Sequence, residues 1–96
     1  MKGKALEKVP RGKLLRVEVN FDKKITWLRI TGDFFAHPED SIEKVEDMIV
    51  GLPVDFNQNK FALCLDDFIK RKDYELIGLD ASAIIRVLKK AMENPI

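Results

Sequence analysis

The chain has 96 residues, of which 46% are hydrophobic, so it is long enough for one domain with a modest core. Seventeen basic and sixteen acidic residues leave a net charge of +1, which argues against a general nucleic-acid binder. A lone cysteine excludes an internal disulfide, and there is neither a signal-peptide pattern nor the apolar run of about 18 residues that crosses a bilayer. We therefore expect a cytoplasmic protein.

The start of the chain is strongly basic. Its first 16 residues carry six basic side chains against Glu7 alone, and the remainder has an excess of acids. Residues 1–12 therefore have two interpretations: a solvated, poorly ordered start, or a short basic arm that meets an acidic surface or a phosphate group. The turn residues Pro10–Gly12 are predicted to separate this arm from the first strand.

The pattern of Lys13–Phe21 alternates apolar and polar residues, which predicts a half-buried strand. A polar turn at Asp22–Lys24 and a second strand at Ile25–Gly32 follow, so we expect an antiparallel hairpin. In the second strand, strict alternation places Ile25 and Trp27 on the outer face, opposite Leu28. A tryptophan there is either covered by another element of the chain or offered to a partner.

The next segment, GDFFAHPED, places two phenylalanines side by side. Neighbouring side chains on a strand point to opposite faces, so Phe34 and Phe35 cannot both enter one core. The segment ends at His37-Pro38, which we expect to be a loop before a helix.

Helical patterns follow. Asp40 and Glu43 form the start of a capping box, an apolar stripe runs to Ile49, and Gly51 suits a left-handed helix end. The acidic residues of this helix, Glu43, Glu46 and Asp47, are expected to form a solvated face.

Two further helices are predicted. The first begins at Asn57 or Asn59 with an apolar stripe of Phe61, Cys64, Leu65, Phe68 and Ile69, so Cys64 is expected to be a buried, inert thiol. The last begins at Asp80 and buries a stripe around Ile84, Val87, Leu88 and Ala91. A short edge strand at Tyr74–Ile77 is an option between them. The order is β-β-α-α-(β)-α, an α+β domain: a small antiparallel sheet packed with about three helices.

The usual catalytic constellations are missing from the chain. It has no P-loop, no dinucleotide-binding glycine motif, no serine-hydrolase elbow and no HExxH pattern. His37 is the only histidine, so no histidine cluster can hold a metal. Asp66 and Asp67 precede Lys70 and Arg71 by one helical turn, which indicates surface ion pairs rather than acid–base chemistry.

One set of motifs resembles a known family. These motifs are PRGKLLRVEV, then ITWLRITG running directly into GDFF, then the acidic helix IEKVEDMIVG. In this order they are similar to the accessory domain of lipoate–protein ligases. The resemblance covers residues 9–51 well and the later helices loosely. Because 96 residues leave no room for a catalytic domain, the chain as a single domain resembles the form that exists as a separate small subunit.

The resemblance implies a role in a complex. The family activates lipoate with ATP and Mg²⁺ to lipoyl-adenylate and transfers the lipoyl group to a lysine of an acyl-carrier (lipoyl) domain. The catalytic residues lie in the large subunit, so no catalytic residue, metal ligand or bound cofactor is expected in this chain alone. The partners are then the catalytic subunit, in a heterodimer, and through it the lipoyl-domain acceptors, with no membrane.

The resemblance also suggests where contacts lie. One of Phe34 and Phe35 anchors the core, and the other, with Trp27 and Asp33, is predicted to face the catalytic subunit. Asp33 caps a local turn or pairs with a base. Arg11 and Lys13 are the candidates to approach the adenylate; the alternative is that they have a structural role at the turn. Two other functions stay open: an independent RNA- or protein-binding module using the basic arm and Trp27, and a small stand-alone enzyme.

Overall fold

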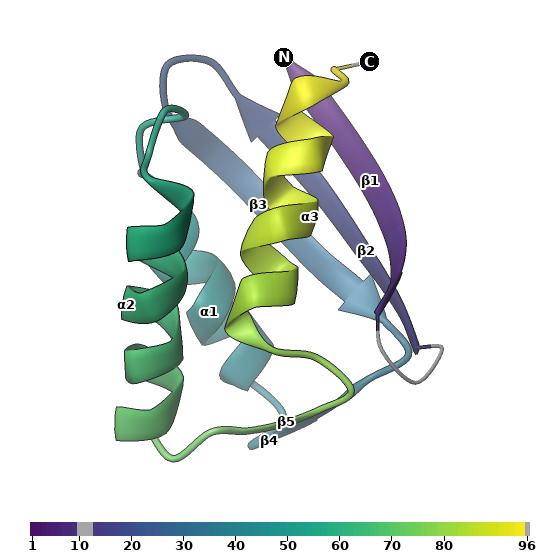
Figure 1. Ribbon diagram of the computed structural model, residues 1–96, viewed down its shortest axis with the longest axis vertical. Coiled ribbons are helices and arrows are strands. Elements are labelled where there is room, and N and C mark those ends of the chain that lie inside the picture. The colour runs from purple at the N-terminus through teal and green to yellow at the C-terminus, as the bar shows by residue number, and fades with distance from the viewer. Residues whose placement is uncertain (10–12, 96) are drawn as a thin grey trace.

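The computed structural model describes residues 1–9 and 13–95 (Figure 1). The elements in chain order are β1 (Lys2–Val9), β2 (Lys13–Phe21), β3 (Ile25–Gly32), β4 (Phe35–His37), α1 (Ser41–Ile49), α2 (Gln58–Arg71), β5 (Glu75–Ile77) and α3 (Ala81–Glu93). The prediction of an α+β fold with a small antiparallel sheet and helices is confirmed. Two strands, β1 and β4, add to the predicted order.

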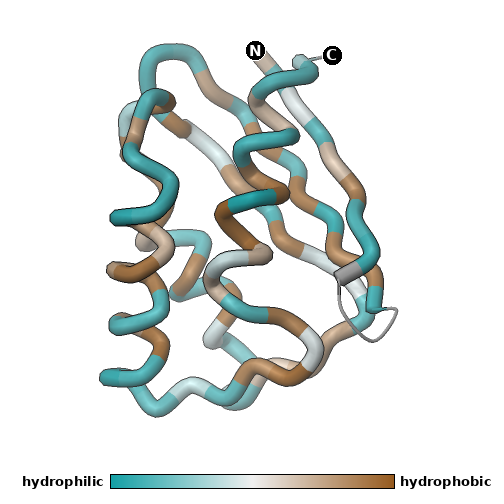
Figure 2. The backbone as a smooth tube through the Cα atoms, in the orientation of Figure 1, coloured by the Kyte–Doolittle hydropathy of each residue, from teal (hydrophilic) through white to brown (hydrophobic). Residues whose placement is uncertain are grey.

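The sheet and the helices form two layers. β1, β2 and β3 pair antiparallel in that order, while β4 and β5 form a separate two-stranded ribbon. The helices lie on one side of the three-stranded sheet (Figure 1), and α3 contacts both β1 and β2. Apolar and polar residues alternate along the strands (Figure 2), so the apolar residues face the helices. The other side of the sheet, hereafter the open face, carries no helix of the described chain.

The segment expected to be a basic arm is mainly a strand. Residues 2–9 pair with residues 13–20 over their whole length, which makes β1 an edge strand of the sheet. Gly3 is buried and Ala5 packs against the core, whereas Lys2 and Lys4 are exposed. These two inward residues are small because α3 lies close to this strand, and small residues give no hydrophobic signal in the sequence. The predicted turn at 10–12 lies outside the described residues.

The β2–β3 hairpin contains a bulge, which places one residue on the opposite side of the sheet from the one predicted. Asn20 pairs with Trp27, but the next residue, Phe21, pairs with Ile25, so Thr26 is extra on β3. A β-bulge places two residues of one strand opposite one of the other and breaks the alternation. Ile25 is therefore buried, at 1% exposed, and the prediction that it shares the outer face with Trp27 is wrong.

Helix α1 begins and ends where the sequence predicts, although its contacts differ. Asp40 is the N-cap residue, but its side chain makes no capping hydrogen bond. Gly51 has a positive φ of 99°, as expected after the helix end. Glu46 is not simply solvated, since its carboxylate accepts a hydrogen bond of 2.7 Å from the Ile30 N–H on the free edge of β3. Burial raises the pKa of Glu46 above its usual range.

Helix α2 confirms Asn57 as its cap, but the prediction of a buried cysteine is wrong. The Asn57 side chain accepts a hydrogen bond of 2.9 Å from the Lys60 N–H. Leu65 is at the centre of the buried face, and Cys64 is exposed. Successive helical residues are about 100° apart, so the residue before Leu65 lies a quarter turn from the centre of the buried face. The two surface ion pairs, Asp66–Lys70 and Asp67–Arg71, are present.

Helix α3 contributes more buried hydrophobic residues than any other described element. Asp80 caps it by accepting a hydrogen bond of 2.8 Å from the Ala83 N–H. Along its length the buried residues are Ala81, Ala83, Ile84, Ile85, Val87, Leu88 and Ala91. Lys89 reaches the segment before α2, where its ammonium donates to the carbonyls of Val54 and Phe56 and lies 4.0 Å from the centre of the Phe56 ring.

An ion-pair cluster joins the first strand to the last helix. Glu7 on β1 accepts hydrogen bonds of 2.9 Å from both Arg86 and Lys90 on α3. The hydrogen bond from Lys90, with help from Arg86, holds the pKa of Glu7 below its usual value, although partial burial opposes this shift. The cluster therefore stabilises the folded chain only while Glu7 is ionised.

This cluster gives a pH-dependent prediction. Glu7→Gln is expected to lower the free energy of unfolding by about 1 kcal/mol at neutral pH, because the pairs are partly exposed. The folded pKa is depressed, so the wild-type advantage is complete above the unfolded pKa of about 4.3 and is lost as the pH falls through the lower folded pKa. Urea unfolding of both proteins at pH 7 and pH 3 measures this, and a difference that grows at pH 3 contradicts it.

Candidate partner interface

The sheet turns into the β4–β5 ribbon at Gly32, the first residue of the GDFF motif. Gly32 has a φ of 151°, and a Cβ added there would collide with the carbonyl oxygen of Leu14 on β2. The same carbonyl accepts a hydrogen bond of 2.9 Å from the Asp33 N–H. Only glycine permits this close approach of two backbones, so the motif fixes the corner from which the two phenylalanines project.

The two phenylalanines point in different directions. Phe34 is half-buried and packs against the core, whereas Phe35, on β4, is 74% exposed. Phe35 lies opposite Ile77 of β5, which is itself 51% exposed. The alternation argument predicted that only one phenylalanine could enter the core, and this geometry agrees with it. The result is an exposed apolar pair on the outer side of the ribbon.

The inner side of the ribbon holds the pair in place. Ala36 lies opposite Leu76, and both are half-buried, with Leu76 packed against the core. His37, expected in a loop, is instead the last residue of β4 and is exposed opposite Glu75. Because one side of this short ribbon is anchored, Phe35 and Ile77 are presented on a supported surface.

Lys13 and Asp33 lie at the same corner. A Cβ added to Gly78, in the loop between β5 and α3, would lie 3.3 Å from the Lys13 side chain and 3.5 Å from the Asp33 carbonyl. Asp33 uses its backbone, not its side chain, for its local hydrogen bond, and among the described residues its carboxylate pairs with no base. Arg11 lies outside the described residues.

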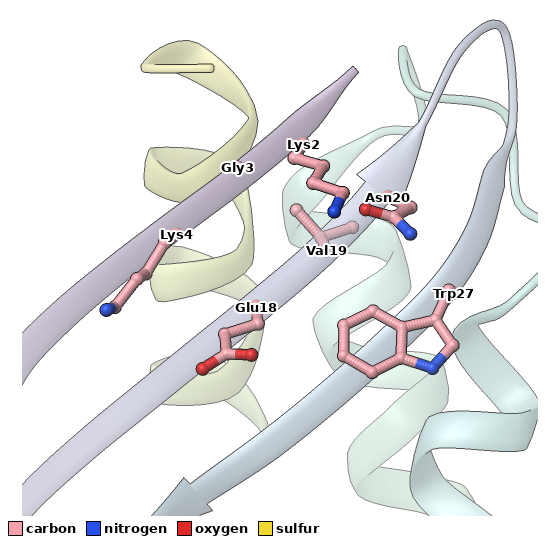
Figure 3. Close-up of a pocket in the computed structure, with 7 residues that line it drawn as sticks. All are labelled: Lys2, Gly3, Lys4, Glu18, Val19, Asn20 and Trp27. Carbon is pink, nitrogen blue, oxygen red and sulfur yellow. The ribbon is translucent and has the colours of Figure 1, made fainter. Parts of the chain in front are cut away.

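Trp27 is at the other end of β3. It projects from the open face opposite Asn20 and is 42% exposed, so no element of the described chain covers it fully. It borders a hollow of about 470 Å³ that is also lined by Lys2, Lys4, Glu18 and Asn20 (Figure 3). Five residue steps along β3 separate Trp27 from Gly32, or about 17 Å at 3.3 Å per residue. The structure therefore does not bring Trp27 together with Phe35.

The corner, comprising Lys13, Asp33, Phe34, Phe35 and Ile77, contains one residue that sequence reasoning missed. Ile77 was placed at the end of an optional strand, but its pairing with Phe35 joins segments about 40 residues apart and leaves no local signal. Within residues 1–9 and 13–95, no cluster of three or more His, Cys, Asp or Glu side chains is placed to hold a metal. None of the described helices has the length and apolar character needed to span a bilayer.

Comparison with known proteins gives two similarities. Lipoate-protein ligase A subunit 2 of Thermoplasma acidophilum is 44% identical over 43 residues, a match that covers 44% of this chain and 46% of the relative. The chain thus spans about half the length of this curated relative. A chain from the structure of a bipartite lipoate protein ligase and its E2 lipoyl domain, also from T. acidophilum, superimposes with a TM-score of 0.73 at 27% identity. That similarity covers 92% of this chain and 94% of the other.

No family model matches the chain. The predicted resemblance to the small subunit of a two-part lipoate–protein ligase is nevertheless confirmed. The relative that is similar in sequence is a second ligase subunit, and the structure that is similar in fold is that of a bipartite ligase.

Proposed function

We propose that this chain is the non-catalytic subunit of a lipoate–protein ligase complex. The catalytic subunit of the complex activates lipoate with ATP and Mg²⁺ to lipoyl-adenylate and transfers the lipoyl group to a lysine of a lipoyl domain. The observation that carries the proposal is the fold similarity, which extends over nearly the whole length of both chains at 27% identity. The sequence match to a second ligase subunit supports it independently.

The contribution of this subunit is closure over the adenylation site of its partner. Excluding water from such a site strengthens every electrostatic interaction around the transferred phosphoryl group, and closure of a domain holds the substrate in place. The chain supplies no catalytic residue, and ATP, Mg²⁺ and lipoate are bound by the complex. Both subunits then act in the cytoplasm, and the heterodimer is the active form.

The corner provides the anchor for this association. Exposed aromatic side chains on a supported surface are what the centre of a protein interface uses, and Phe35 and Ile77 together form such an apolar patch. Phe34 supports Phe35 from the core side, and Asp33 precedes them with a carboxylate that forms no ion pair among the described residues. Lys13 at the same corner then approaches the adenylate of the partner, and Arg11, which lies outside the described residues, is the second candidate for this role.

Reconstitution tests the proposal. The purified chain is mixed with the catalytic subunit of a two-part ligase, ATP, Mg²⁺ and lipoate, and lipoyl-adenylate is measured with and without the chain. We expect adenylate only in the mixture, together with co-elution of the two subunits. Equal adenylate formation without the chain, and no co-elution, would refute the proposal and favour an independent binding module.

A second reconstitution tests the role of Lys13. Lys13→Ala is expected to lower adenylate formation at least about 10-fold without weakening subunit association, if its ammonium approaches the phosphoryl group. Lys60→Ala on α2 is the control, because that lysine is exposed on the far helix of the described chain. A Lys13→Ala complex with unchanged adenylate formation would leave Lys13 a structural residue of the corner.

A further inference from the structure

The open face of the sheet is strongly basic. Five cations project from it, Lys2, Lys4, Lys8, Arg16 and Arg29, with Glu18 as the only carboxylate of the described strands on this side. This gives the face a net charge of +4, whereas the whole chain carries +1, so the rest of the molecule is at −3. A charge of one sign concentrated on one face of a nearly neutral molecule steers an oppositely charged partner toward that face.

The described residues compensate the charge on this face only in part. Glu18 lies between Lys4 and Arg29 across the three strands and forms a 3.9 Å pair with Arg16. One carboxylate cannot neutralise three cations. Among the described residues, four of the five cations form no ion pair: Lys2, Lys4, Lys8 and Arg29. An acidic surface placed over the face would pair with them.

The apolar residues of the face favour a protein as the occupant. Leu6 is 48% exposed, Leu14 is 37% exposed, and Trp27 borders the hollow shown in Figure 3. Single-stranded nucleic acids bind through several aromatic platforms on which successive bases stack, and this face has one. Glu18 at its centre would also repel a phosphate backbone. Cations around exposed apolar side chains match a protein surface that is apolar in part and otherwise acidic.

The corner alone is too small to hold a partner protein in a stable complex. A stable complex buries about 800 Å² per partner, and a large aromatic side chain contributes about 150–250 Å², so Phe35 and Ile77 alone are too small. The open face continues from the corner, because the Leu14 carbonyl accepts the hydrogen bond from the Asp33 N–H. An interface that starts at the corner and extends along the open face adds the exposed side chains of Leu6, Leu14 and Trp27 to the contact.

We infer that the open face docks on an acidic surface of the catalytic subunit, in one interface with the corner, and that charge steers the association. This inference rests on the proposed function, and it adds which face is covered and the chemistry of the surface that covers it. The exposed side of the helices then remains outside the interface.

Charge reversal tests the inference. Lys4→Glu with Arg29→Glu changes the open face by four charge units, and Lys44→Glu with Lys60→Glu makes the same change on exposed positions of α1 and α2. In about 50 mM salt, the open-face variant should associate with the catalytic subunit at least about 10-fold more slowly than wild type, and the helix variant less than about 3-fold more slowly. In about 500 mM salt the difference between the variants should largely disappear.

Four results would overturn the inference. Equal rates for both variants would show that the face is not the docking surface. Unchanged subunit association with slower transfer to a lipoyl domain would assign the face to the acceptor. Binding of a labelled single-stranded RNA that only the open-face reversal removes, with subunit association intact, would assign it to nucleic acid. Finally, if wild type forms no complex at all, the proposed function fails and this inference fails with it. The first three results, in which wild type still forms the complex, refute the inference alone.

Discussion

Phe35→Ala is expected to weaken binding to the catalytic subunit by about 30- to 1,000-fold, the equivalent of the 2–4 kcal/mol that an aromatic hot spot contributes. Phe35 is 74% exposed in the free chain, so its truncation removes almost no internal packing and leaves the fold unchanged. In the complex, the same change removes a large apolar contact and leaves Ile77 without its neighbour across the ribbon. Titration calorimetry with the catalytic subunit measures the dissociation constant, and urea unfolding verifies the fold.

Two further variants are compared with Phe35→Ala to test this prediction. Leu63 on α2 is 72% exposed, so Leu63→Ala removes an equally exposed apolar side chain from a face that we place outside the interface. It should leave the affinity within about 2-fold of wild type, as expected for a residue that makes no contact. Phe34→Ala, which cuts into a side chain packed against the core, should instead lower the free energy of unfolding. Unchanged affinity for Phe35→Ala, or equal losses for Phe35→Ala and Leu63→Ala, would rule out the anchor.

The helices were predictable because their signals are local. Asn57 and Asp80 precede apolar stripes at helical spacing, and each accepts the capping hydrogen bond that its position suggests. Cys64 shows the limit of this reasoning. The predicted buried stripe of α2 includes every apolar residue at helical spacing. The packed face of the helix is narrower than this stripe, and only its centre at Leu65 is fully buried.

The strands were less predictable, because their environment depends on distant parts of the chain. β1 was missed since two of its inward residues, Gly3 and Ala5, are small, and their small size is explained only by the contact with α3, more than 75 residues later. The bulge at Thr26 was equally hidden, and it moved Ile25 from the outer face to the core. In each case long-range packing, rather than local periodicity, decides which way a side chain points.

The candidate interface was predicted only in part for the same reason. Alternation along the GDFF segment indicated that one phenylalanine must leave the core, which is a local argument. The pairing of Phe35 with Ile77 and the distance of Trp27 from both depend on the arrangement of the sheet and the ribbon. The open face could not be predicted without β1, since that strand supplies Lys2, Lys4 and Lys8, three of the four cations on the face that form no ion pair among the described residues.

Gly3→Ala is expected to lower the free energy of unfolding by about 3 kcal/mol, at the upper end of the usual cost of overpacking. A Cβ at this position would collide with the carbonyl oxygen of Ala91 in α3 and lie 3.4 Å from the Val19 side chain. A backbone carbonyl cannot rotate away as a side chain can, so β1 or α3 must move. Urea unfolding should show a lower midpoint with an unchanged slope if the chain still unfolds in one step.

Lys4→Ala is the matched control, because it leaves an alanine one residue later in β1, on the exposed side of the strand. Its free energy of unfolding should stay within about 0.5 kcal/mol of wild type. A Gly3→Ala protein as stable as this control would mean that β1 is not held against α3. A destabilised Gly3→Ala protein should also bind the catalytic subunit less tightly, although Gly3 is buried, because displacing β1 moves Lys2 and Lys4 out of the open face. Affinity lost through a buried glycine would therefore support both the packing of β1 and the proposed use of that face.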